Sequence, residues 1–267
     1  MTILDKIIDH KRKEVELGKQ KLSVKALESS PLFNREINSL SLALQDPDKL
    51  GIIAEFKRRS PSKGLINGDA VVETVTSEYI QAGASGLSVL TDIEFFGGSN
   101  ENLVRARRVN NCPILRKEFI IDEYQLIEAK ALGADVILLI AECLDKKQVY
   151  DLAKFAKSLG LEVLMEIHSE DQLKKVNPYL DIVGVNNRNL KDFSVSIETS
   201  LNLFDKIPEE FVRISESGIS QAEPIAILRQ KGFQGFLIGE YFMKHSDPGQ
   251  ACKNLIEEVV TLRPGII

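Results

Sequence analysis

The sequence predicts a (β/α)8 TIM barrel with an N-terminal helical extension. Short apolar, β-branched runs recur eight times after Gly51, with starts 19 to 35 residues apart. Between them lie stretches with helical periodicity, such as Glu123–Leu132, Lys147–Leu159 and Gln221–Lys231. A repeated strand–helix unit of this length is typical of parallel strands joined by crossover helices. The predicted strands are Ile52–Lys57, Leu87–Thr91, Ile114–Lys117, Val136–Ala141, Val163–Ile167, Ile182–Asn186, Val212–Ser215 and Phe236–Gly239.

Eight such units in about 220 residues favour a closed barrel over an open doubly wound sheet. The open sheet would usually carry a GxGxxG phosphate loop after its first strand, and none follows Lys57. Several predicted helices also end at a glycine, which readily takes the left-handed conformation that closes a helix. These glycines are Gly83, Gly133, Gly160 and Gly232.

Residues 1–47 have a different pattern and form the predicted extension. Thr2 followed by Asp5 has the form of a capping box, and apolar residues at helical spacing then predict a charged helix that ends near Lys19. We expect this extension to pack on the barrel, residues 48–267, within a single domain. The extension contains no group to which the sequence alone assigns a chemical role.

Composition narrows the class of protein. The 267 residues include 34 Lys and Arg against 39 Asp and Glu, a net charge of −5, so no basic field is available and nucleic acid is not an expected partner. The longest uncharged run, Tyr79–Thr91, is shorter than the ~20 apolar residues of a membrane helix, so no membrane contact is expected. Asp5, Lys6 and Asp9 interrupt any signal-peptide core.

The cysteines and histidines are few and scattered along the chain. The odd number of cysteines and the absence of a CxxC pair fit a reducing compartment, so we expect a cytoplasmic protein. No HExxH spacing occurs, and we therefore expect no metal site. The residues are Cys112, Cys143, Cys252, His10, His168 and His245.

Polar residues gather at the C-terminal ends of the predicted strands. Barrel strands are covered on both faces and should be almost wholly apolar, while barrel active sites lie at the C-terminal ends of the strands. Each polar residue alone could be a solvated loop residue or belong to an ordinary ion pair, but six at one edge favour a site. The six are Glu55, Lys57, Lys117, Glu166, Asn186 and Glu216.

Two lysines and three carboxylates around one mouth can pair and shift one another's pKa values, which suits general acid–base catalysis. Schiff-base chemistry by Lys57 or Lys117 is a competing interpretation, since a lysine at a strand end can attack a carbonyl. No nucleophile elbow or Ser-His-Asp arrangement is present.

The last two predicted strands are followed by Ser217-Gly218 and Gly239-Glu240. Glycine lets a backbone approach an oxyanion closely, and a following helix start offers free N–H donors. Barrels often hold a phosphate in the loops after strands seven and eight. Both glycines could simply form tight turns, but a phosphate site is the favoured interpretation.

Six segments of the chain carry a resemblance to a known family: IAEFKRRSPSKG (53–64), LRKEFI (115–120), LMEIH (164–168), VGVNNRNL (183–190), ISESGI (214–219) and FLIGEYFM (236–243). In order and spacing, they resemble the indole-3-glycerol phosphate synthase family. The resemblance implies closure of the indole ring in tryptophan biosynthesis from 1-(2-carboxyphenylamino)-1-deoxyribulose 5-phosphate. Carbon dioxide and water are released without a cofactor or metal, which makes the enzyme a decarboxylating carbon–carbon lyase.

The resemblance also implies a role for each polar residue. Lys117 would protonate the ketone oxygen as the aromatic carbon attacks, and Glu166 would handle a proton during dehydration. Lys57 would pair with the carboxylate or share the acid role. Glu55 and Asn186 would orient the anilino nitrogen and the sugar hydroxyls.

The remaining implied residues surround the rest of the substrate. Glu216 would complete the polar ring, that is, the six polar residues at the strand ends, and Arg188 matches the arginine of the family's sixth-loop motif. Phe96, Phe119 and Leu190 would form apolar walls for the aromatic ring. The residues expected around the phosphate and the first loop are Ser60, Ser217, Gly218, Gly239 and Glu240.

Two alternatives stay open at this point. A phosphoribosylanthranilate isomerase-like barrel would carry a cysteine at the end of the first strand, where this chain has Lys57. A non-catalytic barrel that only binds a phosphorylated ligand should have lost part of the polar ring, and all six residues are present. We expect a small phosphorylated substrate and a monomer, with other enzymes of the tryptophan pathway as candidate docking partners.

Overall fold

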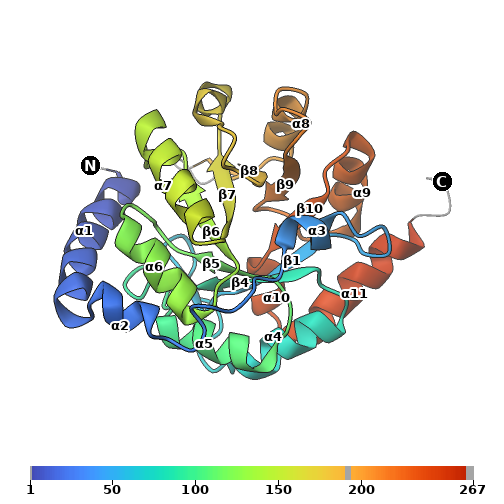
Figure 1. Ribbon diagram of the computed structural model, residues 1–267. Coiled ribbons are helices and arrows are strands. Elements are labelled where there is room, and N and C mark those ends of the chain that lie inside the picture. The colour runs from blue at the N-terminus through green and yellow to red at the C-terminus, as the bar shows by residue number, and fades with distance from the viewer. Residues whose placement is uncertain (1, 190–193, 263–267) are drawn as a thin grey trace.

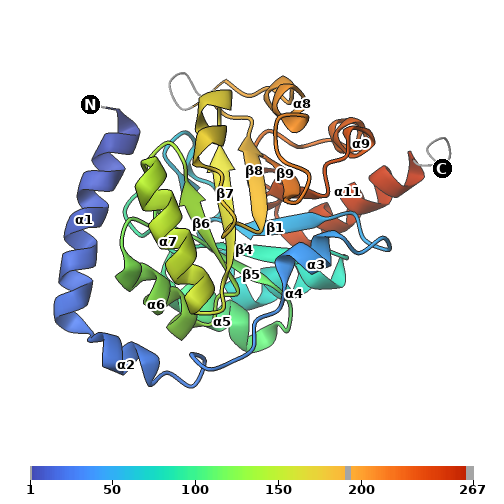
Figure 2. The same ribbon diagram turned by 45° about the horizontal axis from the view of Figure 1, so that its top comes forward.

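The computed structural model describes residues 2–189 and 194–262, and within them eight parallel strands close into a barrel (Figures 1 and 2). Their order around the barrel is β1-β10-β9-β8-β7-β6-β5-β4. The predicted (β/α)8 fold is confirmed, and each predicted strand end lies within one residue of the observed one. The strands are β1 Ile52–Phe56, β4 Gly86–Leu90, β5 Ile114–Lys117, β6 Val136–Ile140, β7 Glu162–Ile167, β8 Ile182–Asn186, β9 Val212–Glu216 and β10 Gly235–Ile238.

Helices surround the barrel and connect its strands (Figure 1). The connection after β7 is a single short 3-10 helix, η1 Glu170–Lys175, which matches the closest spacing of two predicted strands. The first loop contains a small antiparallel hairpin of β2 Arg59–Ser60 and β3 Gly64–Leu65. The other helices are α4 Val72–Gln81, α5 Asn100–Val109, α6 Glu123–Leu132, α7 Lys146–Ser158, α8 Glu198–Phe204, α9 Ala222–Lys231, α10 Glu240–Met243 and α11 Pro248–Thr261.

Glycines close two of these helices in the predicted manner. Gly133 ends α6 with φ +89°, and Gly232 ends α9 with φ +116°, both in the left-handed region. Residues other than glycine rarely adopt that backbone conformation, so the glycines in the sequence indicate these helix ends directly. Among residues 2–189 and 194–262, no helix is both long enough and apolar enough to pass through a bilayer.

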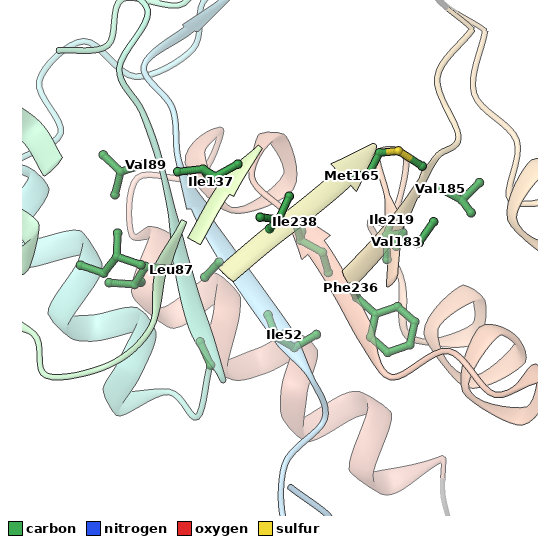
Figure 3. Packing of buried hydrophobic residues seen from close by; sticks show 14 of the residues in the cluster. Ile52, Leu87, Val89, Ile137, Met165, Val183, Val185, Ile219, Phe236 and Ile238 are labelled. Carbon is green, nitrogen blue, oxygen red and sulfur yellow. The ribbon is translucent and has the colours of Figure 1, made fainter. Parts of the chain in front are cut away.

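The core has two layers because side chains alternate along each strand. Ile52, with Leu87 and Ile137, belongs to the layer between the barrel and its helices (Figure 3). Ile53 and Leu115 instead face the barrel interior. The same alternation places Glu55 and Lys117 on the inward side, two residues further along their strands. The strand pattern that builds the core therefore also aims the predicted polar ring inward.

The extension comprises α1 Ile3–Lys21, α2 Val24–Glu28 and α3 Leu40–Leu44. Helix α1 begins at the predicted capping box, where Thr2 and Asp5 exchange hydrogen bonds. In Figures 1 and 2, α1 runs along the outside of the barrel beside α6.

Helix α3 closes the end of the barrel opposite the polar ring. Its Leu40 and Leu44 belong to the interior cluster. The Glu162 carboxylate, at the start of β7, accepts hydrogen bonds from the backbone N–H of Leu40 at 2.8 Å and of Ser41 at 3.0 Å. These donors are the free N–H groups of the first turn of α3. The extension is thus fixed to the barrel by buried apolar contacts and by a buried carboxylate.

Candidate active site

The polar ring lies in a cavity of about 470 Å³ at the C-terminal ends of the barrel strands. The ring residues at the ends of β1, β5, β7, β8 and β9 point to the inside of the barrel, as the interior core residues of the same strands do. All six predicted ring residues line the cavity: Glu55, Lys57, Lys117, Glu166, Asn186 and Glu216. The convergence predicted from the strand ends is therefore present in the structure.

Lys117 stands at the centre of the ring. Its Nζ donates to Glu166 Oε2 at 2.9 Å and to Glu216 Oε2 at 2.8 Å. Burial favours the neutral amine, but Glu166, Glu216 and Glu55 outweigh it and raise the pKa of Lys117 above its ordinary value. Lys117 is therefore a charged donor at neutral pH, positioned by two acceptors from different strands.

Glu166 is held as a carboxylate. Burial would raise its pKa, but Lys117 and a hydrogen bond from Asn186 contribute to lowering the pKa of Glu166 to about 2. Asn186 Nδ2 donates to Glu166 Oε1 at 3.0 Å, and His168 Nε2 lies 3.4 Å from that oxygen. Glu166 is therefore ionised at neutral pH, the form in which a carboxylate can accept a proton.

The pKa of Glu216 shifts in the opposite direction from that of Glu166. Burial, assisted by Glu166 and opposed by Lys117, raises the pKa of Glu216 to about 7. Its Oε1 has no hydrogen-bond partner among the described residues. Gly184 on β8 makes room for this oxygen, since a Cβ there would lie 2.1 Å from it. The ring thus combines a carboxylate and a carboxyl group on either side of one ammonium.

Glu55 and Lys57 form a second pair in the cavity. Lys57 Nζ donates to Glu55 Oε1 at 2.7 Å, and Ser88 Oγ donates to Glu55 Oε2 at 3.2 Å. Burial would raise the pKa of Glu55, but Lys57 and Lys117 hold it below its ordinary value. Glu55 and Lys57 are two residues apart in the sequence, and this contact shows that their side chains lie on the same side of the chain.

The candidate phosphate region lies at the ends of β9 and β10. Ser217 has φ +69° and Gly218 has φ +74°, so two successive residues take the left-handed conformation. Asn187 Nδ2 donates to the Ser217 carbonyl oxygen at 3.1 Å and contributes to holding this turn. A non-glycine residue in that region is strained, and such strain gathers at functional sites.

Gly239 precedes α10, where a Cβ would lie 2.7 Å from Glu55 Oε1. Glycine is required there by the packing of Glu55, in addition to any approach of a ligand. Glu240 accepts from Arg188 at 3.2 Å and lies 3.8 Å from Lys63 Nζ. Ser60, at the end of β2, lines the same cavity.

Apolar side chains form the other wall of the cavity. The Phe96 and Phe119 rings face each other with centroids 5.8 Å apart and planes at 40°. Leu190, the third predicted wall residue, lies outside the described residues. Ile3 and Ile7 of the extension also line the cavity. The sequence showed them as part of an apolar helical stripe, and nothing local to that stripe indicated the surface it covers.

Two other contacts were not predicted. Lys63 approaches Glu240 from the first loop, and His168, the residue directly after β7, approaches Glu166. Both residues fall within the segments that carry the family resemblance. Within the described part of the chain, no three or more His, Cys, Asp or Glu side chains are grouped so that they could hold a metal ion.

Comparison with known proteins identifies the family. The family model described as indole-3-glycerol phosphate synthase matches residues 4–255. The chain belongs to the indole-3-glycerol phosphate synthase family. A protein of that name from Bacteroides thetaiotaomicron is 48% identical over 257 residues, which cover 96% of this chain and 98% of the relative. One from Salinibacter ruber is 42% identical over 97% of this chain and 96% of its own length.

The resemblance based on six short segments is thus confirmed, and the chain belongs to a family of tryptophan-biosynthesis enzymes. Solved structures show the same barrel fold at low identity. Tryptophan synthase subunit alpha from Legionella pneumophila has a TM-score of 0.61 and 14% identity, covering 84% of this chain and 98% of its own. The 3-hexulose-6-phosphate synthase of Salmonella typhimurium has a TM-score of 0.61 and 11% identity, covering 79% and 99%.

Proposed function

We propose that the protein is an indole-3-glycerol phosphate synthase, a decarboxylating carbon–carbon lyase that acts on 1-(2-carboxyphenylamino)-1-deoxyribulose 5-phosphate. The observation that carries this proposal is the position of Lys117 between Glu166 and Glu216, in the same cavity as a pair of aromatic rings. One ammonium, one carboxylate and one carboxyl group of raised pKa are the acid and base equipment that ring closure and dehydration require.

Ring closure is the first step. The ring carbon that bears the substrate carboxylate attacks the ketone carbon, and Lys117 delivers a proton to the ketone oxygen. Preorganised charge at the developing alkoxide lowers the barrier, because no reorganisation is needed during the reaction. Loss of the carboxylate as carbon dioxide then returns the electron pair to the ring and restores its aromaticity.

Dehydration is the second step. The new hydroxyl leaves as water after it receives a proton, and a second proton is removed from the carbon adjacent to the one that carried the hydroxyl. Glu166 is ionised at neutral pH and takes the role of the base, and Glu216, whose pKa is about 7, is a second acid within reach of Lys117. Asn186 orients Glu166, while the Glu55–Lys57 pair faces the anilino nitrogen and the substrate carboxylate.

The phosphate would lie between Ser217-Gly218 and Gly239-Glu240. Ser60 and Arg188 line the cavity on this side, and Lys63 adds a positive charge. The aromatic ring of the substrate would occupy the space beside Phe96 and Phe119.

Schiff-base chemistry by Lys117 is disfavoured. A nucleophilic lysine must be a neutral amine, whereas the carboxylates around Lys117 raise its pKa and keep it charged. A silent binding barrel is disfavoured because each charged member of the ring has a partner within it: Lys57 contacts Glu55, and Lys117 contacts both Glu166 and Glu216.

The direct test is to add the carboxyphenylamino-deoxyribulose phosphate and follow indole absorbance and fluorescence. The chain has no Trp, so its own emission in that window is low. Appearance of indole-3-glycerol phosphate with one carbon dioxide per turnover supports the proposal, while unchanged substrate contradicts it.

We also propose that the protein acts in the cytoplasm as a monomer, and that residues 1–47 and 48–267 fold as one unit. All three cysteines are free thiols, as a reducing compartment favours. The buried carboxylate of Glu162, which joins α3 to the barrel, supports joint folding. Size-exclusion chromatography with light scattering tests the monomer, and a single unfolding transition seen by two probes tests the joint unit.

A further inference from the structure

A buried lysine connects the extension to the mouth of the barrel. Lys11 lies on α1 and is only 1% exposed. Its Nζ is 3.1 Å from Asp92 Oδ2 and 2.9 Å from Glu118 Oε1, and it donates to the partly exposed Glu14 at 2.8 Å. Asp92 follows β4 and Glu118 follows β5, so one ammonium joins three parts of the molecule. Within the described residues, Lys11 is the only cation within 4 Å of either buried carboxylate.

Each of the two carboxylates fixes the backbone of one aromatic wall residue. Asp92 Oδ1 accepts from the N–H of Phe95 at 2.7 Å and of Phe96 at 3.1 Å. Glu118 Oε1 accepts from the N–H of Phe119 at 2.8 Å. The rings of Phe96 and Phe119 are the pair that face each other across 5.8 Å. The spacing of that pair therefore depends on two carboxylates that share one lysine.

The electrostatics make this lysine necessary. Asp92 is fully buried and Glu118 is 3% exposed, and two buried carboxylates that face one ammonium would repel each other without it. Glu118 also accepts from Thr91 Oγ1 at 2.6 Å, which ties the loop after β5 to the end of β4. Removing the ammonium would thus push apart the two loops that carry the aromatic pair.

We propose that Lys11 is a positioning residue for the aromatic ring of the substrate. It acts through Asp92 and Glu118, which hold Phe96 and Phe119 at their observed separation. This proposal rests on the proposed function, because the aromatic wall is assigned to the substrate's carboxyphenyl ring. Lys117 is held by Glu166 and Glu216 on other strands, so its acid role does not depend on Lys11.

The first test compares Lys11→Met with Arg12→Met. Methionine replaces the aliphatic part of the lysine side chain and removes the charge. Arg12 is 67% exposed and pairs only with the exposed Asp9 among the described residues. We expect Lys11→Met to raise KM by about ten- to a hundredfold, as misplaced binding groups do, with kcat within about threefold of wild type. Arg12→Met should leave both constants unchanged. A fall in kcat at unchanged KM would overturn the proposal.

The second test separates the aromatic ring from the phosphate. Substrate whose ketone has been reduced to an alcohol cannot close the ring and reports binding alone, while inorganic phosphate probes only the phosphate region. Lys11→Met should weaken the reduced substrate about as much as it raises KM and leave inhibition by inorganic phosphate unchanged. Equal weakening of both ligands would indicate general loosening of the barrel and overturn the positioning role.

Rescue variants keep the test valid if Lys11→Met fails to fold. Lys11→Arg keeps the charge, and the triple variant Lys11→Met, Asp92→Asn, Glu118→Gln removes all three charges but keeps oxygen acceptors for the Phe96 and Phe119 N–H groups. Both should have a KM within about threefold of wild type, because neither leaves a buried charge unpaired. A folded triple variant with a strongly raised KM would overturn the proposal.

The two proposals fail in different ways. If the wild type does not convert the substrate, the proposed function fails, whatever Lys11 does. If the wild type converts the substrate and Lys11→Met has the same KM, only the role of Lys11 fails.

Discussion

Glu216 should make the stability of the protein depend on pH between about pH 5 and 8. Burial and the neighbouring Glu166, opposed by Lys117, raise its pKa from 4.5 to about 7. Between these values the folded state keeps a proton that the unfolded state has released. The stability linked to this proton is fully present below 4.5 and is lost as the pH rises through about 7.

The structure sets the size of the effect. A rise of the pKa from 4.5 to about 7, at about 1.36 kcal/mol per pH unit, corresponds to about 3 kcal/mol of unfolding free energy. Glu166 has its pKa lowered to about 2, so its contribution is present above 4.5 and is lost only in more acidic solution. Within the pH 5 to 8 window, Glu216 is therefore the ring carboxylate that titrates.

Glu216→Gln should remove this dependence. Unfolding in urea at about pH 5, 6.5 and 8 should show wild type losing about 3 kcal/mol relative to the variant across the series. The amide can itself shift stability by a constant amount, so the slope with pH is the diagnostic quantity. Glu210→Gln, at an exposed position, is the matched control and should follow wild type. Parallel pH curves for wild type and Glu216→Gln would refute the reasoning.

Two further predictions follow from single contacts, and a third concerns metal dependence. Gly184→Ala should lower kcat by about a hundredfold, because the added Cβ would displace Glu216 from Lys117. Steady-state kinetics measures kcat, circular dichroism confirms that the variant is folded, and an unchanged kcat would contradict the prediction. Glu162→Ala should destabilise the protein by about 2–4 kcal/mol, since the N–H groups of Leu40 and Ser41 lose a buried acceptor. Urea unfolding measures the loss of stability, and a change below about 0.5 kcal/mol would count against the role of the Glu162 contact in fixing α3 to the barrel. Chelation with EDTA should leave turnover unchanged, because the ring residues supply the acid and base; loss of activity restored by one divalent ion would overturn this.

The barrel could be predicted because its signals are local. Each strand is a short β-branched run, and its alternation decides which residues face inward. Glu55 follows Ile53 and Lys117 follows Leu115 at a spacing of two, so the sequence already placed both beside interior core positions. The convergence of the ring followed from the rule that barrel strands present their C-terminal ends at one mouth.

The contacts of the extension could not be predicted in the same way. Lys11 is one of many charges on a helix whose pattern reveals only an apolar stripe, and its burial depends on Asp92 and Glu118, which lie far along the chain. The contact of Glu162 with α3 has the same cause. Sequence periodicity indicates which face of a helix is buried but not which partner covers it.

Gly239 illustrates a third limit. The sequence suggested a glycine that admits a phosphate, whereas the nearest atoms to a Cβ there belong to Glu55. A glycine pattern indicates a close approach, and only the structure identifies the approaching group.

The central claim is that Lys117 delivers the proton for ring closure and that Glu166 serves the later dehydration. Rapid-quench single turnovers with substrate labelled at its carboxylate separate the two steps, because carbon dioxide reports the first and indole the second. Lys117→Met should slow both products by about 10²- to 10⁴-fold, or about 3–5 kcal/mol of barrier, since the first bond cannot form. Glu166→Gln should release carbon dioxide at nearly the wild-type rate while indole formation lags. If Glu166→Gln slowed both products equally while Lys117→Met still released carbon dioxide, the assignment would be contradicted.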